Sequence, residues 1–460
     1  MYKIDFNKPI HVHFMGIGGI SMSGFAELLH TMGFTITGSD SKETKITKHL
    51  ESLGISIIYE QAASNITKDI DLVVYTAAIH PDNEEYAACV SMGIPMMDRA
   101  EMVGQVMKNY KSAIAVSGTH GKTTTTSMIS HIMLAANLDP TISVGGILKA
   151  IDGNIRIGKS DNFITEACEY TNSFLKFNPT IGIILNIEAE HLDFFKDLND
   201  IRNSFHKFAE RLPESGLLVI NGSISNYSEI TDGLSCQVVT YSIDNPSCNI
   251  YADNISFNEK GFGSFDLIVN KENKGRIELN VVGIHNISNA LAAIAVGLNF
   301  HISIETIQNG LSGFFGTDRR FQYKGTIGGV TIIDDYAHHP TEIAATLSSV
   351  KNISCKTTWC VFQPHTYSRT KAFLKDFAKA LSLADKIVLA DIYAARETDT
   401  GEISSLDLKR ELETLGKEVY YFPSFDEIEN FLLENCINGD LLITMGAGDI
   451  VAVGESLLGN

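Results

Sequence analysis

The sequence of 460 residues has a deficit of basic residues, no closely spaced cysteines and no long apolar run. Lys and Arg number 36 against 55 Asp and Glu, which gives a formal net charge of −19. This acidic balance argues against nucleic acid or an anionic membrane as a partner, because both require a basic face on the protein. Any site for phosphate groups must therefore be local.

The seven cysteines are scattered and include no C-x-x-C pair, which argues against a disulfide framework and against a thiolate zinc site. The longest clean apolar run, residues 290–298, is far shorter than the roughly 20 residues of a membrane-spanning helix. The first residues carry no apolar segment typical of a secretory signal. We therefore expect a cytoplasmic protein.

Short apolar runs alternate with helical patterns along most of the chain, which predicts an α/β fold built on parallel sheets with crossover helices. Eight runs are the clearest strand candidates: residues 10–14, 72–75, 113–116, 181–185, 217–220, 330–333, 387–389 and 441–443. Two sets of apolar residues at i, i+3, i+4 and i+7 predict helices with one buried stripe. They are Phe25, Leu28, Leu29 and Met32, and Leu291, Ile294, Ala295 and Leu298.

The length predicts about three domains at roughly 150 residues each. Three Gly-bearing strand-to-helix turns divide the chain into a Rossmann-like domain over residues 1–109, a central domain over residues 110–315 and a second Rossmann-like domain over residues 316–460. The central domain is expected to hold a parallel sheet of the phosphate-loop ATPase type. Residues 249–282 lose the alternating pattern and predict short antiparallel strands.

The strongest motif is a phosphate loop that follows the strand at 113–116 and precedes a helix. It comprises Gly118, Thr119, His120, Gly121, Lys122, Thr123 and Thr124. The glycines let backbone N–H groups point into one concavity, the helix N-terminus adds positive charge, and Lys122 and Thr123 can reach the phosphates and Mg²⁺. The general pattern has a glycine at position 116, where this chain has Val116, so the loop is a shorter variant.

A second turn, with Gly16, Gly18 and Gly19, follows the first strand and is similar to the dinucleotide fingerprint G-x-G-x-x-G. Ser21 stands where the third glycine is expected. The turn therefore predicts either a pyrophosphate site without a nicotinamide or a tight structural turn. Asp40, which ends the next strand, is either a ribose ligand or a helix N-cap.

Carboxylates follow two further strands of the predicted central sheet. Glu166 and Glu169 come after one strand, and Glu188 and His191 come after the next. In a parallel sheet both turns reach the same edge as the phosphate loop, where carboxylates could bind Mg²⁺ and His191 could bind a second ion. The alternative is that each is a solvated loop residue.

Polar residues also follow the later strands. His285, Asn286 and Asn289 lie at a strand-to-helix junction, where the two amides could read an adenine edge, or Asn286 or Ser288 could cap the helix. In the last third, the residues at predicted strand ends are Arg319, Arg320, Tyr336, His338 and Arg369. Guanidinium groups there could clamp carboxylates and a histidine could deprotonate an amine, or the histidine could be structural.

Five motifs, taken in order, jointly resemble the Mur ligase family. They are MGIGGI at 15–20, SGTHGKTT at 117–124, GIHN at 283–286, DYAHHPTE at 335–342 and QPH at 363–365. The resemblance runs the length of the chain and is greatest to the branch of the family that adds alanine. It implies ATP and Mg²⁺ as cofactors, UDP-N-acetylmuramic acid and L-alanine as small-molecule substrates, and a monomer or weak homodimer.

The resemblance also implies roles for single residues. Gly16, Gly18 and Gly19 would hold the diphosphate of the sugar nucleotide, with Asp40 and Thr76 nearer the uridine. Residues 118–124 would hold the ATP phosphates, and Thr123, Glu166 and His191 would ligate two Mg²⁺ ions. The adenine would meet His285, Asn286 and Asn289.

The remaining set would surround the reacting carboxylate and the amino acid: Arg319, Arg320, Tyr336, His338 and Arg369. The catalytic residues implied are Lys122, Glu166, His191, His338 and Arg369. In the implied reaction, the lactyl carboxylate of the sugar nucleotide attacks the γ-phosphate of ATP, and alanine displaces phosphate from the resulting acyl phosphate.

Two positions depart from the family pattern. Cys168 replaces the Asp of E-A-D-E, and Glu190 replaces the Asp of N-x-E-x-D-H. Three other functions stay open from the sequence: a sister ligase that joins a murein tripeptide to the same sugar nucleotide, a nicotinamide dehydrogenase built on the first turn, and a nucleotide-gated binding module without chemistry.

Overall fold

The computed structural model describes residues 2–76, 78–191, 194–351, 353–395 and 397–459. The chain forms two compact units, one of Met1–Tyr251 with Leu291–Gly310 and one of Ala252–Ala290 with Leu311–Asn460. The first unit contains two mainly parallel sheets. The second contains a further, mainly parallel sheet and a group of antiparallel strands.

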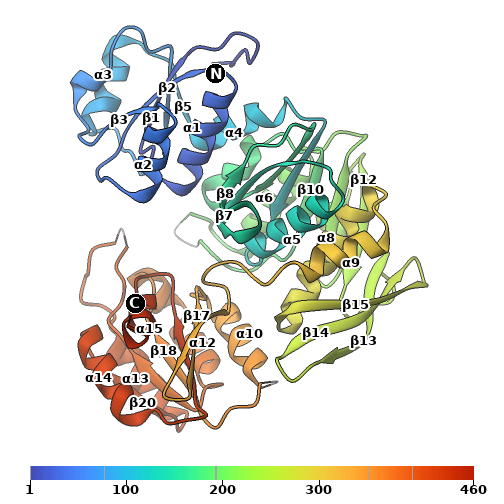
Figure 1. Ribbon diagram of the computed structural model, residues 1–460, viewed down its shortest axis with the longest axis vertical. Helices are drawn as coiled ribbons and strands as arrows, with labels where there is room; N and C mark the ends of the chain where they lie inside the picture. Colours follow the sequence, from blue (N-terminus) through green and yellow to red (C-terminus); the bar gives the residue numbers. More distant parts are fainter. Residues whose placement is uncertain (1, 77, 192–193, 352, 396, 460) are drawn as a thin grey trace. The chain divides into compact units, whose positions relative to one another are not determined.

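The N-terminal sheet, blue in Figure 1, has five parallel strands in the order β3-β2-β1-β4-β5. The strands are β1 (His11–Met15), β2 (Thr35–Ser39), β3 (Ser56–Ile58), β4 (Leu72–Tyr75) and β5 (Met96–Asp98). They are joined by α1 (Ile20–Thr31), α2 (Lys45–Ser52), η1 (Ala63–Asn65), α3 (Glu84–Met92) and, after β5, α4 (Arg99–Met107). Asn83 caps α3 by accepting hydrogen bonds from two backbone N–H groups, and Asp98 caps α4.

The central sheet of the first unit runs in the order β12-β11-β10-β6-β9-β7-β8, with only β8 antiparallel to its neighbour. Its strands are β6 (Ser112–Ser117), β7 (Thr141–Leu148), β8 (Gly153–Arg156), β9 (Asn162–Glu166), β10 (Ile181–Ile184), β11 (Leu217–Asn221) and β12 (Gln237–Ser242). The helices are α5 (Lys122–Ala135), η2 (Lys149–Ile151), η3 (Tyr170–Lys176), α6 (Leu198–Ala209) and α7 (Ser228–Thr231). Because β6, β9 and β10 are parallel, their carboxyl ends lie at one edge of the sheet.

The antiparallel strands of the second unit are β13 (Ile250–Phe257), β14 (Phe262–Val269) and β15 (Glu272–Val282). They confirm the antiparallel pattern predicted over residues 249–282. The first two residues of β13 belong to the first unit and pair in parallel with β12. Helices α8 (Ile284–Asn299) and α9 (Ile304–Ser312) follow.

The C-terminal sheet has six strands in the order β16-β17-β21-β18-β19-β20, with β16 antiparallel and the others parallel. The strands are β16 (Gln322–Ile327), β17 (Val330–Asp335), β18 (Thr358–Phe362), β19 (Lys386–Leu389), β20 (Glu418–Tyr421) and β21 (Leu441–Met445). The helices are α10 (Pro340–Val350), α11 (Tyr367–Ala372), α12 (Leu374–Leu381), α13 (Ser405–Thr414), α14 (Phe425–Asn435) and α15 (Val451–Leu457).

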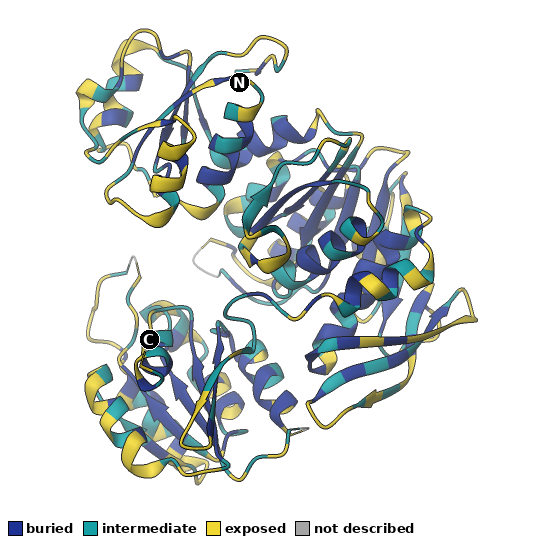
Figure 2. Cartoon of the chain, in the orientation of Figure 1, coloured by how far each residue is buried: buried dark blue, intermediate teal, exposed yellow. Residues whose placement is uncertain are grey.

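Buried residues lie mostly on the strands, and exposed residues lie mostly on the outward faces of helices and in loops (Figure 2). In α1, the predicted stripe is confirmed: Phe25, Leu28 and Leu29 are buried and Met32 packs against them. In α8, the prediction of one buried stripe underestimates how much of the helix surface is buried. Residues 289–297 are buried on every side, because this helix is enclosed by other elements and has no solvent face there.

The α/β class is confirmed, and all eight predicted strands are present with ends displaced by at most two residues. The seven cysteines, all within the described residues, are free thiols. None of the helices in the described part of the chain has the length and apolar character needed to cross a membrane. The domain boundaries at 109/110 and 315/316 stay a prediction.

Candidate active site

The phosphate loop lies between β6 and α5. Gly118 has a φ of 143° and Gly121 a φ of 82°, which residues with a Cβ rarely adopt. A Cβ on Gly118 would lie 2.9 Å from Leu185 Cβ, so the loop packs closely against the residue that follows β10. Gly121 is the N-cap residue of α5, and the loop therefore ends at the N-terminus of a 14-residue helix, where anions bind favourably.

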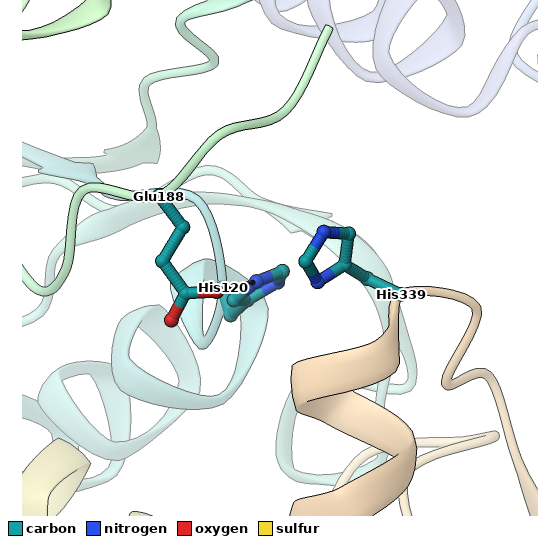
Figure 3. A group of neighbouring side chains, drawn as sticks. All are labelled: His120, Glu188 and His339. Atoms are coloured by element: carbon teal, nitrogen blue, oxygen red, sulfur yellow. Dashed lines mark hydrogen bonds and ion pairs between the residues drawn. The ribbon is translucent and has the colours of Figure 1, made fainter. Parts of the chain in front are cut away.

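The segment after β10 holds this loop in shape. The backbone oxygen of Asn186 accepts a hydrogen bond from Thr119 N–H (3.2 Å). Its side-chain amide accepts from His120 N–H (2.8 Å) and donates to the His120 carbonyl (3.0 Å). Glu188 donates its N–H to Thr119 Oγ1 (2.9 Å), and its carboxylate lies 3.3 Å from His120 Nε2 (Figure 3).

Two of the loop's backbone N–H groups are thus used within the protein. The N–H groups of Thr119 and His120 both donate to Asn186 and are therefore not available to a phosphate. The N–H groups in the first turn of α5 have no earlier helical carbonyl to bind. These are the donors best placed to meet an anion.

Lys122 occupies the centre of the loop. Its Nζ donates to the carbonyls of Gly118 (2.5 Å) and Thr119 (3.0 Å) and to Glu169 Oε2 (3.1 Å). Burial would lower the pKa of Lys122, but the Glu169 carboxylate outweighs burial and raises the pKa above its ordinary value. Lys122 is therefore a fixed positive charge at neutral pH.

Glu166, at the end of β9, contacts the start of α5. Its Oε2 accepts a hydrogen bond from Thr123 Oγ1 (3.0 Å), and its Oε1 accepts from Gly145 N–H (2.5 Å). A hydroxyl beside a carboxylate is an arrangement of hard oxygen atoms that suits Mg²⁺. The structure thus brings together two of the three predicted metal ligands.

The third predicted ligand, His191, lies beside Glu169. His191 Nε2 is 3.8 Å from Glu169 Oε1, and the His191 ring packs on Tyr170 with 4.4 Å between the ring centroids. Glu169 Oε1 is buried and accepts no hydrogen bond from the residues that the structure describes. A buried carboxylate oxygen facing an imidazole is a donor set that fits a divalent cation.

Cys168, which departs from the family pattern, lies between Glu166 and Glu169 in the same segment. Burial raises the pKa of its thiol, with Lys122 acting in the opposite direction. The thiol is therefore neutral at physiological pH. It supplies no negative charge at this edge of the sheet, where the family pattern has an aspartate.

The first predicted loop lies at the end of β1. Gly16 has a φ of 76°, and the N–H groups of Gly16 and Ile17 both donate to the Ser39 carbonyl (2.9 and 3.0 Å). A Cβ on Gly16 would lie 2.8 Å from Thr76 Cγ2, which places Thr76 next to the loop. Gly19 is the N-cap residue of α1.

Asp40 braces the same loop. Its Oδ2 accepts from Gly18 N–H (2.8 Å) and its Oδ1 from Ser41 N–H (2.8 Å). The alternative that Asp40 is a helix N-cap is wrong, because Thr44 caps α2 through its side chain. Asp40 and Thr76 therefore lie against the glycines that they were predicted to accompany.

The predicted adenine residues lie in the first turns of α8. Asn286 donates to the Val282 carbonyl (2.8 Å), and Asn289 donates to Asn286 Oδ1 (3.0 Å). Because α8 begins at Ile284, Asn286 and Ser288 are inside the helix and the N-cap alternative is wrong for both. Burial lowers the pKa of His285 to about 4, and Arg320 acts in the same direction, so His285 is neutral at pH 7.

The five residues predicted at strand ends of the last third lie close together. The guanidinium carbons of Arg319 and Arg320 are 4.8 and 5.4 Å from the centre of the Tyr336 ring. The His338 ring lies 5.5 Å from the Tyr336 ring and 5.8 Å from the His365 ring. The series continues to Arg369, whose Nη1 is 3.1 Å from His365 Nδ1.

Arg319 is also a structural residue. Its Nε donates to Asp334 Oδ2 (3.0 Å), Nη1 to the Gly448 carbonyl (3.0 Å) and Nη2 to the Gly446 carbonyl (2.8 Å). Every nitrogen of the guanidinium therefore has a partner in the protein. Arg320 Nη1 lies 3.6 Å from Glu342 Oε1, so Arg320 is held less firmly than Arg319.

Sequence reasoning gave no role to Asn186, and it placed Glu169 only among the carboxylates that could bind Mg²⁺. Asn186 directly follows a predicted strand, and a polar residue at that position was the available signal. Glu169 lies within the predicted carboxylate cluster, but its contact with a lysine 47 residues earlier is visible only in the fold.

Comparisons with known proteins cover the same segments. Three family models match: "Mur ligase family, catalytic domain" over residues 11–111, "Mur ligase middle domain" over residues 116–297 and "Mur ligase, glutamate ligase domain" over residues 319–448.

Full-length relatives are closely similar in sequence. UDP-N-acetylmuramate–L-alanine ligases from Lachnoclostridium phytofermentans and Agathobacter rectalis are 59% and 60% identical to this chain, over 100% of both chains in each case. A solved UDP-N-acetylmuramate–alanine ligase from Thermotoga maritima matches with a TM-score of 0.82 at 29% identity over 98% of each chain. A murein peptide ligase from Psychrobacter arcticus has a TM-score of 0.72 at 24% identity over 98% of each chain, a likeness of fold alone. From its motifs, its matched domains and these relatives, the chain belongs to the Mur ligase family.

Proposed function

We propose that this protein is an ATP-dependent ligase that joins L-alanine to UDP-N-acetylmuramic acid during synthesis of peptidoglycan precursors, releasing ADP and phosphate. The observation that carries the proposal is identity of 59 to 60% over the whole chain to ligases of that name. The phosphate loop supports the use of ATP, since its lysine, its helix N-terminus and its neighbouring carboxylates are all present.

In this reaction the lactyl carboxylate of the sugar nucleotide attacks the γ-phosphate of ATP, and the amine of alanine then displaces phosphate from the acyl phosphate. Attack of one anion on another requires the repulsion between them to be reduced. Lys122 supplies a positive charge that stays protonated, and the first turn of α5 supplies oriented N–H groups. Catalysis rests mainly on positioning and electrostatics.

We infer that Mg²⁺ is required. When bound, the ion neutralises negative charge on the phosphate oxygens. Thr123 and Glu166 would hold one ion, since their oxygens are 3.0 Å apart, and His191 would serve a second. Gly16, Gly18 and Gly19, with Asp40 and Thr76, would hold the sugar nucleotide by its diphosphate and uridine, and His285, Asn286 and Asn289 would meet the adenine.

In the second unit, Arg320, Tyr336, His338 and Arg369, with Arg319 as their support, would bind the carboxylate groups and the amino acid. His338 Nδ1 lies 2.9 Å from the Tyr336 carbonyl, so this nitrogen carries the proton that it donates. That tautomer leaves the lone pair on Nε2. His338 is therefore able to accept a proton from the ammonium group of alanine.

The substrates are soluble nucleotides and an amino acid. We therefore infer that the enzyme works in the cytoplasm, and we propose from the family resemblance that it is a monomer or a weak homodimer.

The test is release of phosphate from ATP and Mg²⁺ by the purified protein in the presence of UDP-N-acetylmuramic acid. Alanine, serine, glycine and the murein tripeptide are supplied in turn, and products are identified by mass spectrometry. We expect phosphate release with alanine and a product heavier by one alanyl residue. Turnover with the tripeptide alone would assign the sister activity, and binding of ATP without phosphate release would refute a ligase function.

A further inference from the structure

Glu85 is a buried acid that no step of the proposed reaction uses. It lies in the first turn of α3, and its side chain is 0% exposed. Because an ionised carboxylate is costly to remove from water, a buried one is expected to be paired or hydrogen-bonded. The partners of Glu85 therefore indicate what the residue does.

The two oxygens of Glu85 face different parts of the N-terminal sheet. Oε1 accepts a hydrogen bond from Asn65 Nδ2 (2.6 Å) and lies 3.8 Å from Nε2 of the buried His13. Oε2 accepts a hydrogen bond from Ser39 Oγ at 2.6 Å. Burial would raise the pKa of Glu85, but these three contacts outweigh burial and lower the pKa. Glu85 is therefore an anion at neutral pH.

Ser39 connects Glu85 to the glycine turn that follows β1. Ser39 is the last residue of β2, and its carbonyl accepts hydrogen bonds from the N–H groups of Gly16 (2.9 Å) and Ile17 (3.0 Å). Ser39 thus donates to Glu85 with its side chain and holds two amides of the turn with its backbone. The position of one carboxylate is in this way linked to the shape of the turn.

One backbone contact and one side-chain contact hold the peptide that follows Ser39 from outside the turn. The backbone contact is the hydrogen bond from Asp40 N–H to the Ile58 carbonyl (3.0 Å). The side-chain contact is the bond from the Ser39 hydroxyl to Glu85, and a hydrogen bond to an ionised group is stronger than one between neutral groups. Loss of this bond would give the Ser39 carbonyl more freedom to turn away from the amides that it accepts.

We propose that Glu85 is a positioning residue: through the Ser39 hydroxyl it fixes the carbonyl that shapes the glycine turn, and it thereby raises the affinity of the turn for the sugar nucleotide. The inference deepens the proposed function and rests on it in one respect, the assignment of the sugar nucleotide to this turn. Glu85 itself does not touch the substrate. The alternative is a purely structural role, in which Glu85 joins α3 to Asn65 and His13 without any effect on the turn.

The first measurement is hydrogen–deuterium exchange of the full-length protein without ligand, followed by mass spectrometry of the peptide that contains Gly16 and Ile17. Ser39→Ala removes the hydroxyl and keeps the carbonyl. Glu85→Gln leaves one acceptor oxygen for two donors, so the bond to Ser39 is lost or weakened. We expect each variant to speed exchange of the turn amides by about 10-fold, the equivalent of one hydrogen bond to a charged group.

The second measurement is isothermal titration calorimetry with UDP-N-acetylmuramic acid. Both variants should bind it about 10-fold more weakly than the wild type does. They should bind a non-hydrolysable ATP analogue that carries a β,γ-imido group with unchanged affinity, since the phosphate loop belongs to another sheet. The double variant should lose no more affinity than the weaker-binding single variant, because both changes remove the same hydrogen bond.

Two control variants separate positioning from structure. Asn65→Ala removes a donor from the other oxygen of Glu85 and leaves the bond to Ser39 in place. It should lower the midpoint of thermal unfolding without changing exchange of the turn or affinity for the sugar nucleotide. Glu84→Gln makes the same chemical change on the exposed preceding residue and should behave as the wild type does. Circular dichroism confirms that each variant is folded.

Unchanged exchange of the turn in Ser39→Ala and Glu85→Gln would overturn the inference. So would an equal increase in Asn65→Ala, because it would show a general loosening of the domain rather than a connection through Ser39. Faster exchange with unchanged affinity for the sugar nucleotide would also contradict it. Failure of the proposed function is a separate outcome: the wild type would neither bind the sugar nucleotide nor form an alanyl product, while the exchange data would still show whether Glu85 holds the turn.

Discussion

Removal of the Asn186 side chain should loosen the phosphate loop without unfolding the sheet. Asn186→Ala deletes the two side-chain hydrogen bonds to the His120 peptide, at 2.8 and 3.0 Å. The bond from Thr119 N–H to the backbone oxygen of residue 186 stays, because it does not depend on the side chain. The loop then loses the two side-chain hydrogen bonds to His120 and keeps the backbone hydrogen bond to Thr119.

The size of the effect follows from those two bonds. A hydrogen bond of this kind contributes about 1 kcal/mol net, so the pair contributes about 2 kcal/mol to the loop conformation. If that conformation is the one that binds the nucleotide, affinity for the ATP analogue should fall by about 30-fold. The free energy of unfolding should fall by no more than the same 2 kcal/mol.

The assay is isothermal titration calorimetry with the analogue, alongside urea unfolding. Asn221→Ala is the matched control, since Asn221 also ends a strand of this sheet and also makes two side-chain bonds to backbone, to the Leu185 carbonyl and from Ser223 N–H. It makes no bond to the phosphate loop. Equal affinity of Asn186→Ala and wild type, or an equal loss in Asn221→Ala, would refute the reasoning.

Three further predictions concern charges at the two sets of strand ends. Lys122→Ala should abolish phosphate release. It should also lower the free energy of unfolding by on the order of 3 kcal/mol, because Glu169 is left buried without its counter-ion. The double variant Lys122→Met/Glu169→Gln should regain stability in urea unfolding but not turnover, and recovered turnover would contradict the role of the lysine. Glu166→Ala should lose activity that excess Mg²⁺ only partly restores in the phosphate-release assay, and an unchanged rate at limiting Mg²⁺ would count against its role. Burial raises the pKa of Asp335 to about 6, so the folded state favours the protonated carboxyl more than the unfolded state does. Protonated Asp335 therefore contributes on the order of 3 kcal/mol to the free energy of unfolding below about pH 4, and this contribution is lost as the pH rises through 6. The stability of Asp335→Asn relative to wild type should therefore improve between pH 4 and pH 7, whereas parallel pH profiles would show that Asp335 titrates normally.

The sequence predicts the sheets well because their signal is local. Each strand is a short apolar run bounded by turn residues, so all eight predicted strands appear with small errors at their ends. The glycines of both loops are likewise local signals, since Gly16, Gly118 and Gly121 have positive φ angles that other residues avoid.

The partners of polar side chains are a different matter, because they depend on contacts between distant segments. The amide of Asn186 meets a peptide 66 residues earlier, and no pattern in the sequence specifies that meeting. For the same reason the sequence predicts Arg319 as a ligand for a carboxylate. In the structure its guanidinium donates to two carbonyls more than 120 residues later in the chain. Residue type and position predicted which side chains gather, but not which bonds they make.

Three of the cations at these strand ends are paired with acids of the protein itself. Lys122 pairs with Glu169, Arg319 with Asp334 and Arg320 with Glu342. An incoming polyphosphate thus meets compensated charges on a chain whose net charge is −19. At low ionic strength the long-range field slows its approach, and salt that shortens the Debye length to about 8 Å removes that barrier. Encounter with anionic substrates should then become faster as salt is added, the reverse of what electrostatic steering gives.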